Sequence, residues 1–126
     1  MPSRRAVLTL ACLALAVPAC ARHRVGSGAA IPAEWSLTVT NHHWLDCEIY
    51  VVHSGLTTRV GLVTATATET FVLQTYLLGP GGDIRLLAIP IGGAQRVSTG
   101  VITISGGQSV EWTLERTLRS SSFSVH

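Results

Sequence analysis

The sequence of 126 residues contains no lysine, three cysteines and one methionine, and only 13% of its residues are charged. Its nine basic residues, all arginine, and its seven acids give a formal net charge of +2. That balance excludes the strongly basic surface typical of nucleic-acid-binding proteins, so we expect no nucleic-acid partner. Three cysteines cannot build a framework of several disulfides or a four-cysteine zinc site. Hydrophobic residues make up 47% of the chain, enough for the core of one globular domain.

The first 20 residues have the pattern of a bacterial secretory signal peptide. Arg4 and Arg5 supply the positive start, and residues 6–17 form an apolar run without any charge. A helix of that length measures about 18 Å, too short for the roughly 30 Å of a membrane's hydrocarbon core. The pattern therefore predicts export rather than a membrane span. Paired arginines also occur in twin-arginine signals, so the export route stays open.

Residues 17–20, Val-Pro-Ala-Cys, resemble the lipobox of bacterial lipoproteins. The resemblance implies that Cys20 becomes the mature N-terminus and is lipidated, so that its acyl chains anchor the protein to a membrane. Pro18 departs from the lipobox pattern, which usually has a small or aliphatic residue at that position. The alternative is ordinary signal cleavage after Ala21, at an A-x-A site, which would release a soluble periplasmic or secreted protein.

The mature chain is predicted to consist of a tether and one domain. Residues 21–33 are rich in small residues and show no periodicity, as expected of a flexible linker to a domain over 34–126. Removal of the signal takes two arginines away and leaves seven arginines to balance seven acids. No electrostatic attraction to nucleic acid or to an anionic membrane surface remains.

From residue 34 onward the sequence predicts one short strand after another, separated by turn residues. The frequent turn signals predict an all-β domain, an antiparallel β-sandwich of immunoglobulin-like size with about seven strands. Gly106 and Gly107 predict a tight hairpin turn between two of these strands. The strands are expected at 36–41, 47–53, 58–64, 68–76, 84–89, 101–105 and 109–114, with a short one at 122–125.

The alternation of apolar and polar residues assigns the faces of the strands. Trp112 alternates with Val110 and Leu114, and we expect it to be the central aromatic residue of the core. Two further sets are each expected to share a strand face: Cys47 with Ile49 and Val51, and Val60 with Leu62.

Residues 39–61 carry Asn41, Asp46, Ile49-Tyr50-Val51, Arg59 and Gly61, and residues 107–112 read Gly-Gln-Ser-Val-Glu-Trp. With these elements the chain resembles small secreted bacterial β-domains of no established function. The resemblance implies a β-sandwich fold and an exported protein, and it implies no reaction. Cys47 departs from the resemblance because an aliphatic residue would be expected there.

One cluster holds potential metal ligands: residues 41–47, with His42 and His43, followed by His53. Histidine, thiolate and carboxylate are ligands for zinc and copper. Cys47 and His53, at the two ends of one strand, would lie about 20 Å apart and cannot share a metal ion. The competing interpretation is a polar loop in which Trp44 covers the core. A metal-binding protein using His42 and His43, with or without His53, is our alternative hypothesis.

Catalytic residues are not evident, so we predict a protein that is not an enzyme and needs no cofactor. Cys47 stands between two acids, which would raise the pKa of its thiol, and a buried structural cysteine is expected. The leading hypothesis is a binding or structural module at the cell envelope, with an envelope protein or a glycan as its partner. Loops at residues 41–46 and 91–98 are the expected contact region, with Trp44 and Arg96 as anchors.

Overall fold

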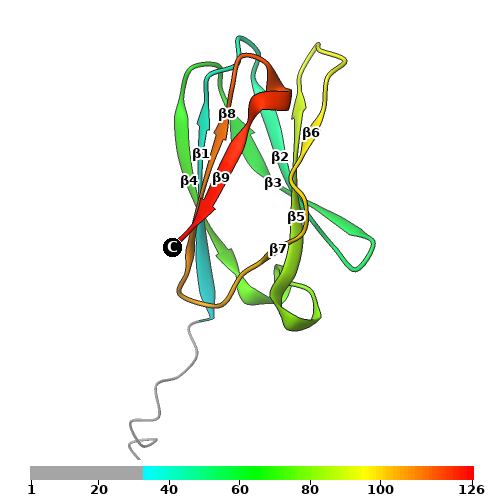
Figure 1. The fold of residues 1–126 in the computed structure, drawn as a ribbon, viewed down its shortest axis with the longest axis vertical. Helices are drawn as coiled ribbons and strands as arrows, with labels where there is room; N and C mark the ends of the chain where they lie inside the picture. The colour runs from blue at the N-terminus through cyan, green and yellow to red at the C-terminus, as the bar shows by residue number, and fades with distance from the viewer. Residues whose placement is uncertain (1–32) are drawn as a thin grey trace, which may run out of the picture.

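The computed structural model describes residues 33–126, which form two β-sheets packed face to face (Figure 1). The predicted all-β sandwich is therefore confirmed. The predicted signal segment, Cys20 and residues 21–32 of the tether lie outside the described residues. Within the described part, no helix has the length and apolarity that a membrane crossing requires.

Nine strands and three short 3₁₀ helices make up the described part of the chain, against the seven or so strands that we predicted. The strand that the sequence did not indicate is β6, which has only two residues. The strands are β1 (Glu34–Asn41), β2 (Cys47–His53), β3 (Leu56–Val63), β4 (Thr68–Gln74), β5 (Asp83–Pro90), β6 (Val97–Ser98), β7 (Ile102–Thr103), β8 (Ser109–Leu114) and β9 (Ser122–Val125). The 3₁₀ helices are η1 (Thr75–Leu77), η2 (Pro80–Gly82) and η3 (Leu118–Ser120).

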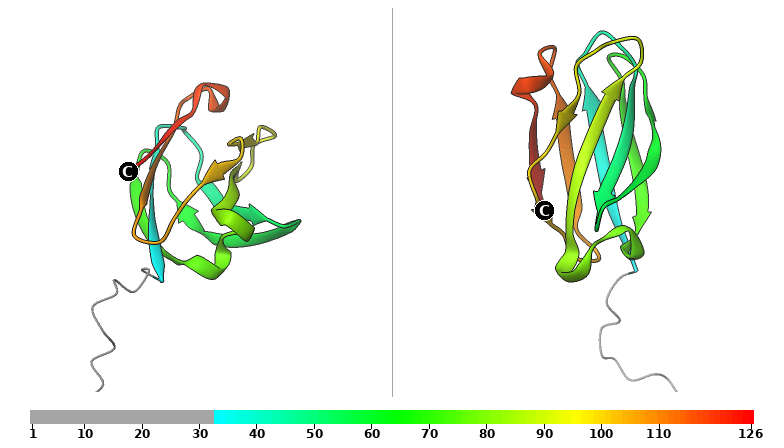
Figure 2. Two further views of the ribbon diagram at one scale, coloured as in Figure 1. Left: turned by 60° about the horizontal axis from the view of Figure 1, so that its bottom comes forward. Right: turned by 90° about the vertical axis from the view of Figure 1, so that its right-hand side faces the viewer.

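The two layers are seen from two further directions in Figure 2. One sheet has the order β4-β1-β8-β9, and the other has the order β3-β2-β5-β6. The short strand β7 also pairs with β5, at the start of that strand. Among the described strands one pair is parallel: β1 runs alongside β8, with Leu37 opposite Val110 and Val39 opposite Trp112. The prediction of an antiparallel sandwich holds for the other pairs.

The core lies between the sheets and is made of alternate residues of the long strands. Trp112 is 1% exposed, which confirms the expectation that it is a central core residue. Trp35 is 2% exposed and joins it, although the sequence did not assign it to the core. Cys47, Ile49 and Val51 are all fully buried, as their alternation predicted.

The prediction that Val60 and Leu62 share a face is wrong. The register between β2 and β3 shifts after Ile49, so β3 carries one extra residue at this point. Such a bulge reverses the side to which the following side chains point. Val60 packs against the core, whereas Leu62 is 37% exposed on the outside.

The predicted hairpin at Gly106 and Gly107 is also wrong. The strand before these glycines, β7, pairs with β5, whereas β8 pairs with β1 and β9 in the other sheet. The turn thus carries the chain from one sheet to the other. Gly107 adopts a φ of +84°, and its N–H donates to the carbonyl of Glu34 at 2.8 Å. The positive φ that we expected in a hairpin turn therefore occurs in a connection between the two sheets.

Candidate functional site

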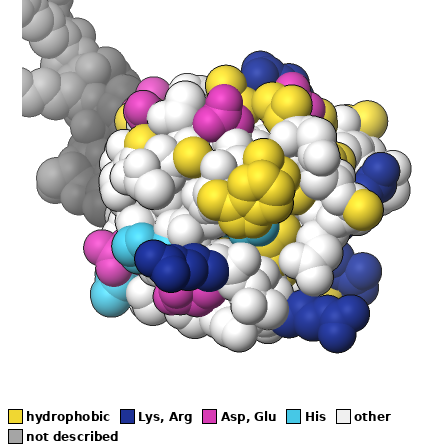
Figure 3. All heavy atoms as spheres, turned by 90° about the horizontal axis from the view of Figure 1, so that it is seen from above, with side chains coloured by type: hydrophobic (Ala, Val, Ile, Leu, Met, Phe, Trp, Pro, Cys, Tyr) yellow, Lys and Arg dark blue, Asp and Glu magenta, His cyan; other side chains and the backbone are white. Residues whose placement is uncertain are grey.

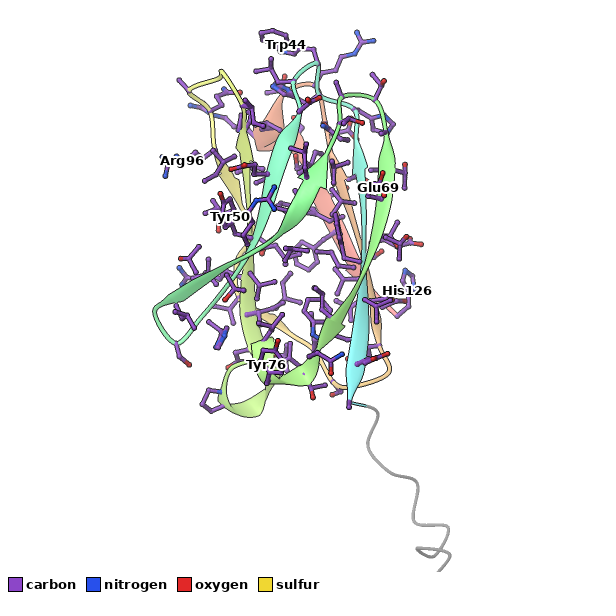
Figure 4. All side chains as sticks on the ribbon, turned by 180° about the vertical axis from the view of Figure 1, so that it is seen from behind. Trp44, Tyr50, Glu69, Tyr76, Arg96 and His126 are labelled. Atoms are coloured by element: carbon purple, nitrogen blue, oxygen red, sulfur yellow. The ribbon has the colours of Figure 1, made fainter. Side chains whose placement is uncertain are left out.

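Four loops gather at one end of the sandwich, and β1 begins at the opposite end (Figures 1 and 4). We call the loop-rich end the Trp44 end; it comprises residues 42–46, 64–67, 91–96 and 115–121. Asp46 ties three of these loops together. Its carbonyl accepts the N–H of Ile91, and its carboxylate accepts the N–H of Ala65, both at 2.8 Å. Residues 42–46 and 91–96 lie at this end, as expected, whereas the last two residues of the expected 91–98 loop form β6.

Asn41 fixes the shape of the loop that follows it. Its side chain is fully buried, and its amide nitrogen lies 2.9 Å from the carbonyl oxygen of Leu45 and within 3.3 Å of those of Val63 and Thr64. Its side-chain oxygen accepts the N–H of His43 at 2.9 Å. A buried amide with all of these partners holds the loop in one conformation.

His43 and Trp44 are neighbours in sequence but have opposite environments. His43 is 5% exposed, and its Nδ1 lies 2.9 Å from the carbonyl oxygen of Arg116. Since a carbonyl only accepts hydrogen bonds, Nδ1 carries the hydrogen. Trp44 is 73% exposed at the tip of the loop, so the interpretation that it covers the core is wrong. Its ring centroid lies 5.6 Å from that of His43.

A pocket of about 330 Å³ opens beside Trp44. A wider hollow of about 710 Å³ lies on the other side of Arg116 and Thr117, which border both. Figure 3 views this end directly and shows hydrophobic side chains at its centre, with both basic and acidic side chains around them. The pocket residues that carry polar groups are His43, Trp44, Gln95, Arg116 and Thr117.

Arg96, the second predicted anchor, does not border this pocket. It lies on the side of the molecule near Tyr50, as Figure 4 shows. The Tyr50 hydroxyl donates to the Glu48 carboxylate at 2.7 Å, and this bond raises the pKa of Tyr50, while the nearby charges of Arg59 and Arg96 act in the opposite direction. The structure therefore places Trp44 and Arg96 in different surroundings.

Arg116 and Thr117 were missed as site residues, and Gln95 was not singled out within the expected 91–98 loop. Arg116 and Thr117 belong to the loop after β8, and Gln95 belongs to the loop after β5. Nothing in their local sequence indicates a site, because their proximity to Trp44 arises from the pairing of strands that are distant in sequence.

The histidines of the metal hypothesis are separated in the structure. His42 is exposed, His43 is buried and bonded to the backbone, and His53 ends β2, the strand that leads away from the Trp44 end. Across residues 33–126, no three or more His, Cys, Asp or Glu side chains are grouped so that they could hold a metal ion.

Cys47 is fully buried at the start of β2, as the sequence predicted. Its burial, and then the negative charge of Asp46, raise the pKa of its thiol, and a weak contact with Asn41 acts in the opposite direction. A protonated thiol without access to solvent is a poor nucleophile. Cys47 therefore contributes packing to the core.

At the Trp44 end an exposed aromatic ring, a pocket and several polar side chains thus meet. An exposed tryptophan beside a pocket is suited to binding, because a large apolar ring can be covered by a partner. Compared with protein families and with curated proteins, the chain matches none at a significant level.

Proposed function

We propose that the protein is an exported, lipid-anchored β-sandwich that acts as a non-enzymatic binding or structural module at the bacterial cell envelope. The positive start with Arg4 and Arg5, the apolar run at 6–17 and the lipobox-like residues 17–20 support export and lipidation at Cys20. The sandwich fold suits a binding module, because its strands form a scaffold from which loops reach a partner.

The observation that carries the proposal is the position of Trp44 relative to the start of β1. Glu34, the first residue of β1, lies at the end opposite the Trp44 end (Figure 1). A chain anchored through Cys20 would enter the domain at Glu34, so the exposed Trp44 lies at the end of the domain that is farther from the point of attachment. A flexible linker of residues 21–33 would span roughly 20 Å, and a strand of eight residues adds about 26 Å.

The test is a fractionation of cells that produce the full chain. Cys20→Ser should move the protein from the detergent-soluble membrane fraction to the aqueous fraction, because the acyl chains are lost. Cys12→Ser is the matched control, since Cys12 lies inside the apolar run and should leave the membrane association unchanged.

Mass spectrometry of the mature N-terminus decides between the two cleavage sites. The proposal predicts an acylated Cys20. An aqueous wild-type protein that begins at Arg22 would show cleavage at the A-x-A site and would contradict the lipid anchor.

A further inference from the structure

We propose that the pocket beside Trp44 binds a sugar ring that carries one carboxylate and belongs to an otherwise uncharged glycan. The inference rests on the proposed function in one respect: the cell envelope is the place where the protein would encounter such a glycan. The chemistry of the pocket itself is argued from its residues.

The first observation is the unused nitrogen of His43. This side chain is 95% buried, since its exposed fraction is 5%, and its one hydrogen bond in the described residues uses Nδ1. Every fully buried side-chain nitrogen and oxygen of the described part has a partner, so Nε2 is an accessible atom. The pocket beside Trp44 is the one that His43 borders. Because Nδ1 carries the hydrogen, Nε2 of this pocket-lining imidazole is the nitrogen that can accept a hydrogen bond from a ligand hydroxyl.

The second observation is the indole of Trp44. The other two tryptophans, Trp35 and Trp112, are buried in the core, whereas Trp44 is 73% exposed. An aromatic side chain offers a broad apolar face, and a pyranose ring has one face of C–H groups that can lie against it. The C–H face of a sugar ring can therefore pack against the indole while the hydroxyl groups at its edge bond to the polar groups of this pocket.

The charges define the ligand further. Arg116 is the one charged residue that borders the pocket, and a guanidinium binds a carboxylate through two parallel hydrogen bonds. Residues 34–126 contain five arginines and seven acids, so the domain as a whole repels polyanions. These two facts together favour a single carboxylate on an uncharged chain over a nucleic acid or a densely acidic polymer.

The space available agrees with this ligand. A volume of about 330 Å³ is at the lower end of the range of small-molecule pockets, so it accommodates about one ring. Thr117 and Arg116 also border the wider hollow of about 710 Å³, which contains Glu115 and Ser120. The neighbouring uncharged rings of a glycan can continue into that hollow.

The experiment compares two disaccharides on the purified full chain in detergent. The acidic probe joins N-acetylglucosamine to N-acetylmuramic acid, and the neutral probe is di-N-acetylchitobiose, which lacks the lactyl carboxylate. Calorimetry should give saturable binding of the acidic probe, with affinity for the neutral probe at least about fivefold weaker. Because Trp44 is the exposed tryptophan, its fluorescence should shift on binding.

Matched variants locate the site. Trp44→Ala should weaken the binding of the acidic probe by about tenfold or more, whereas Tyr76→Ala, which removes an exposed aromatic ring at the other end of the molecule (Figure 4), should have no effect. Arg116→Gln should abolish the preference for the acidic probe. Arg119→Gln should preserve it, because Arg119 borders neither hollow.

Several results would overturn the inference. These are the absence of saturable binding, equal affinity for the two disaccharides, unchanged affinity in Trp44→Ala, and tighter binding of trigalacturonic acid, in which every ring is charged. Binding to anionic lipid vesicles that depends on Trp44, without sugar binding, would also overturn it. Such failures leave the Cys20→Ser fractionation unaffected, so they are distinguishable from a failure of the proposed function.

Discussion

The side-chain oxygen of Asn41 accepts the backbone N–H of His43 at 2.9 Å, and this bond starts the loop that presents Trp44. An Asx turn of this kind reverses the chain without help from secondary structure. Because the same amide also reaches the carbonyl oxygens of Leu45, Val63 and Thr64, the loop and the neighbouring turn depend on one buried side chain.

Asn41→Ala should therefore lower the free energy of unfolding by about 2–4 kcal/mol, because several buried backbone groups lose their partner. Urea denaturation followed by circular dichroism measures the change. Thr38→Ala is the control: it removes the solvent-exposed hydrogen bond with Thr70 and should cost at most about 0.5 kcal/mol. Equal losses in the two variants would show that Asn41 does not organise this end.

Replacing each of two tryptophans by alanine should separate the core from the surface. Trp112→Ala should cost about 3–5 kcal/mol, because it removes a side chain that is 1% exposed and leaves a cavity. Trp44→Ala should change the stability by at most about 0.5 kcal/mol, since that ring is 73% exposed. A large loss in Trp44→Ala would contradict the assignment of this ring to the surface.

Gly82 should tolerate alanine less well than Gly55, although both have φ values between +75° and +84°. The unfavourable backbone conformation costs each variant about 1–2 kcal/mol. A Cβ at Gly82 would also collide with the backbone carbonyl of Ile104, whereas a Cβ at Gly55 meets nothing. We expect the melting temperature of Gly82→Ala to be clearly the lower of the two, and equal values would contradict the close packing of η2 against Ile104.

The thiol of Cys47 should make the stability depend on pH in the alkaline range. Burial raises its pKa in the folded state above the value of about 8.5 in the unfolded chain. Below that pH both states hold the proton and the stability is constant; as the pH rises further, the unfolded state ionises first and the stability falls.

The wild-type free energy of unfolding should fall more steeply than that of Cys47→Ala between pH 8 and 10. Iodoacetamide labelling of the native protein, with mass spectrometry of the peptide that contains Cys47, should show protection. Rapid labelling of this peptide under native conditions would contradict the burial.

The sequence was sufficient to predict the fold class and the position of most strands. The strands Cys47–His53, Ser109–Leu114 and Ser122–Val125 agree with the expected ranges, because alternation is clear between turn residues on both sides. The two residues of β6 are too few to show any alternation. The bulge near Val60 has no local signal either, because it depends on the pairing of β3 with β2.

The candidate site was predictable only in part. Trp44 and the two loops at one end follow from the local pattern of polar loops between strands. Arg96 was expected beside Trp44 because it lies in the right loop, but its neighbour Gln95 borders the pocket instead. Arg116 reaches the site through the contact of its carbonyl with His43, and a contact between such distant residues cannot be read from one sequence.

The parallel pairing of β1 with β8 has a consequence for how the protein is made. Leu37 in β1 pairs with Val110 in β8, which is synthesised much later. The first sheet therefore cannot be completed until the chain is nearly finished. Contacts of such long range form slowly, so we expect the complete sandwich to form only when synthesis is nearly finished. Under the export that we propose, a chain that completes its sandwich so late is suited to being threaded unfolded through a narrow translocation channel.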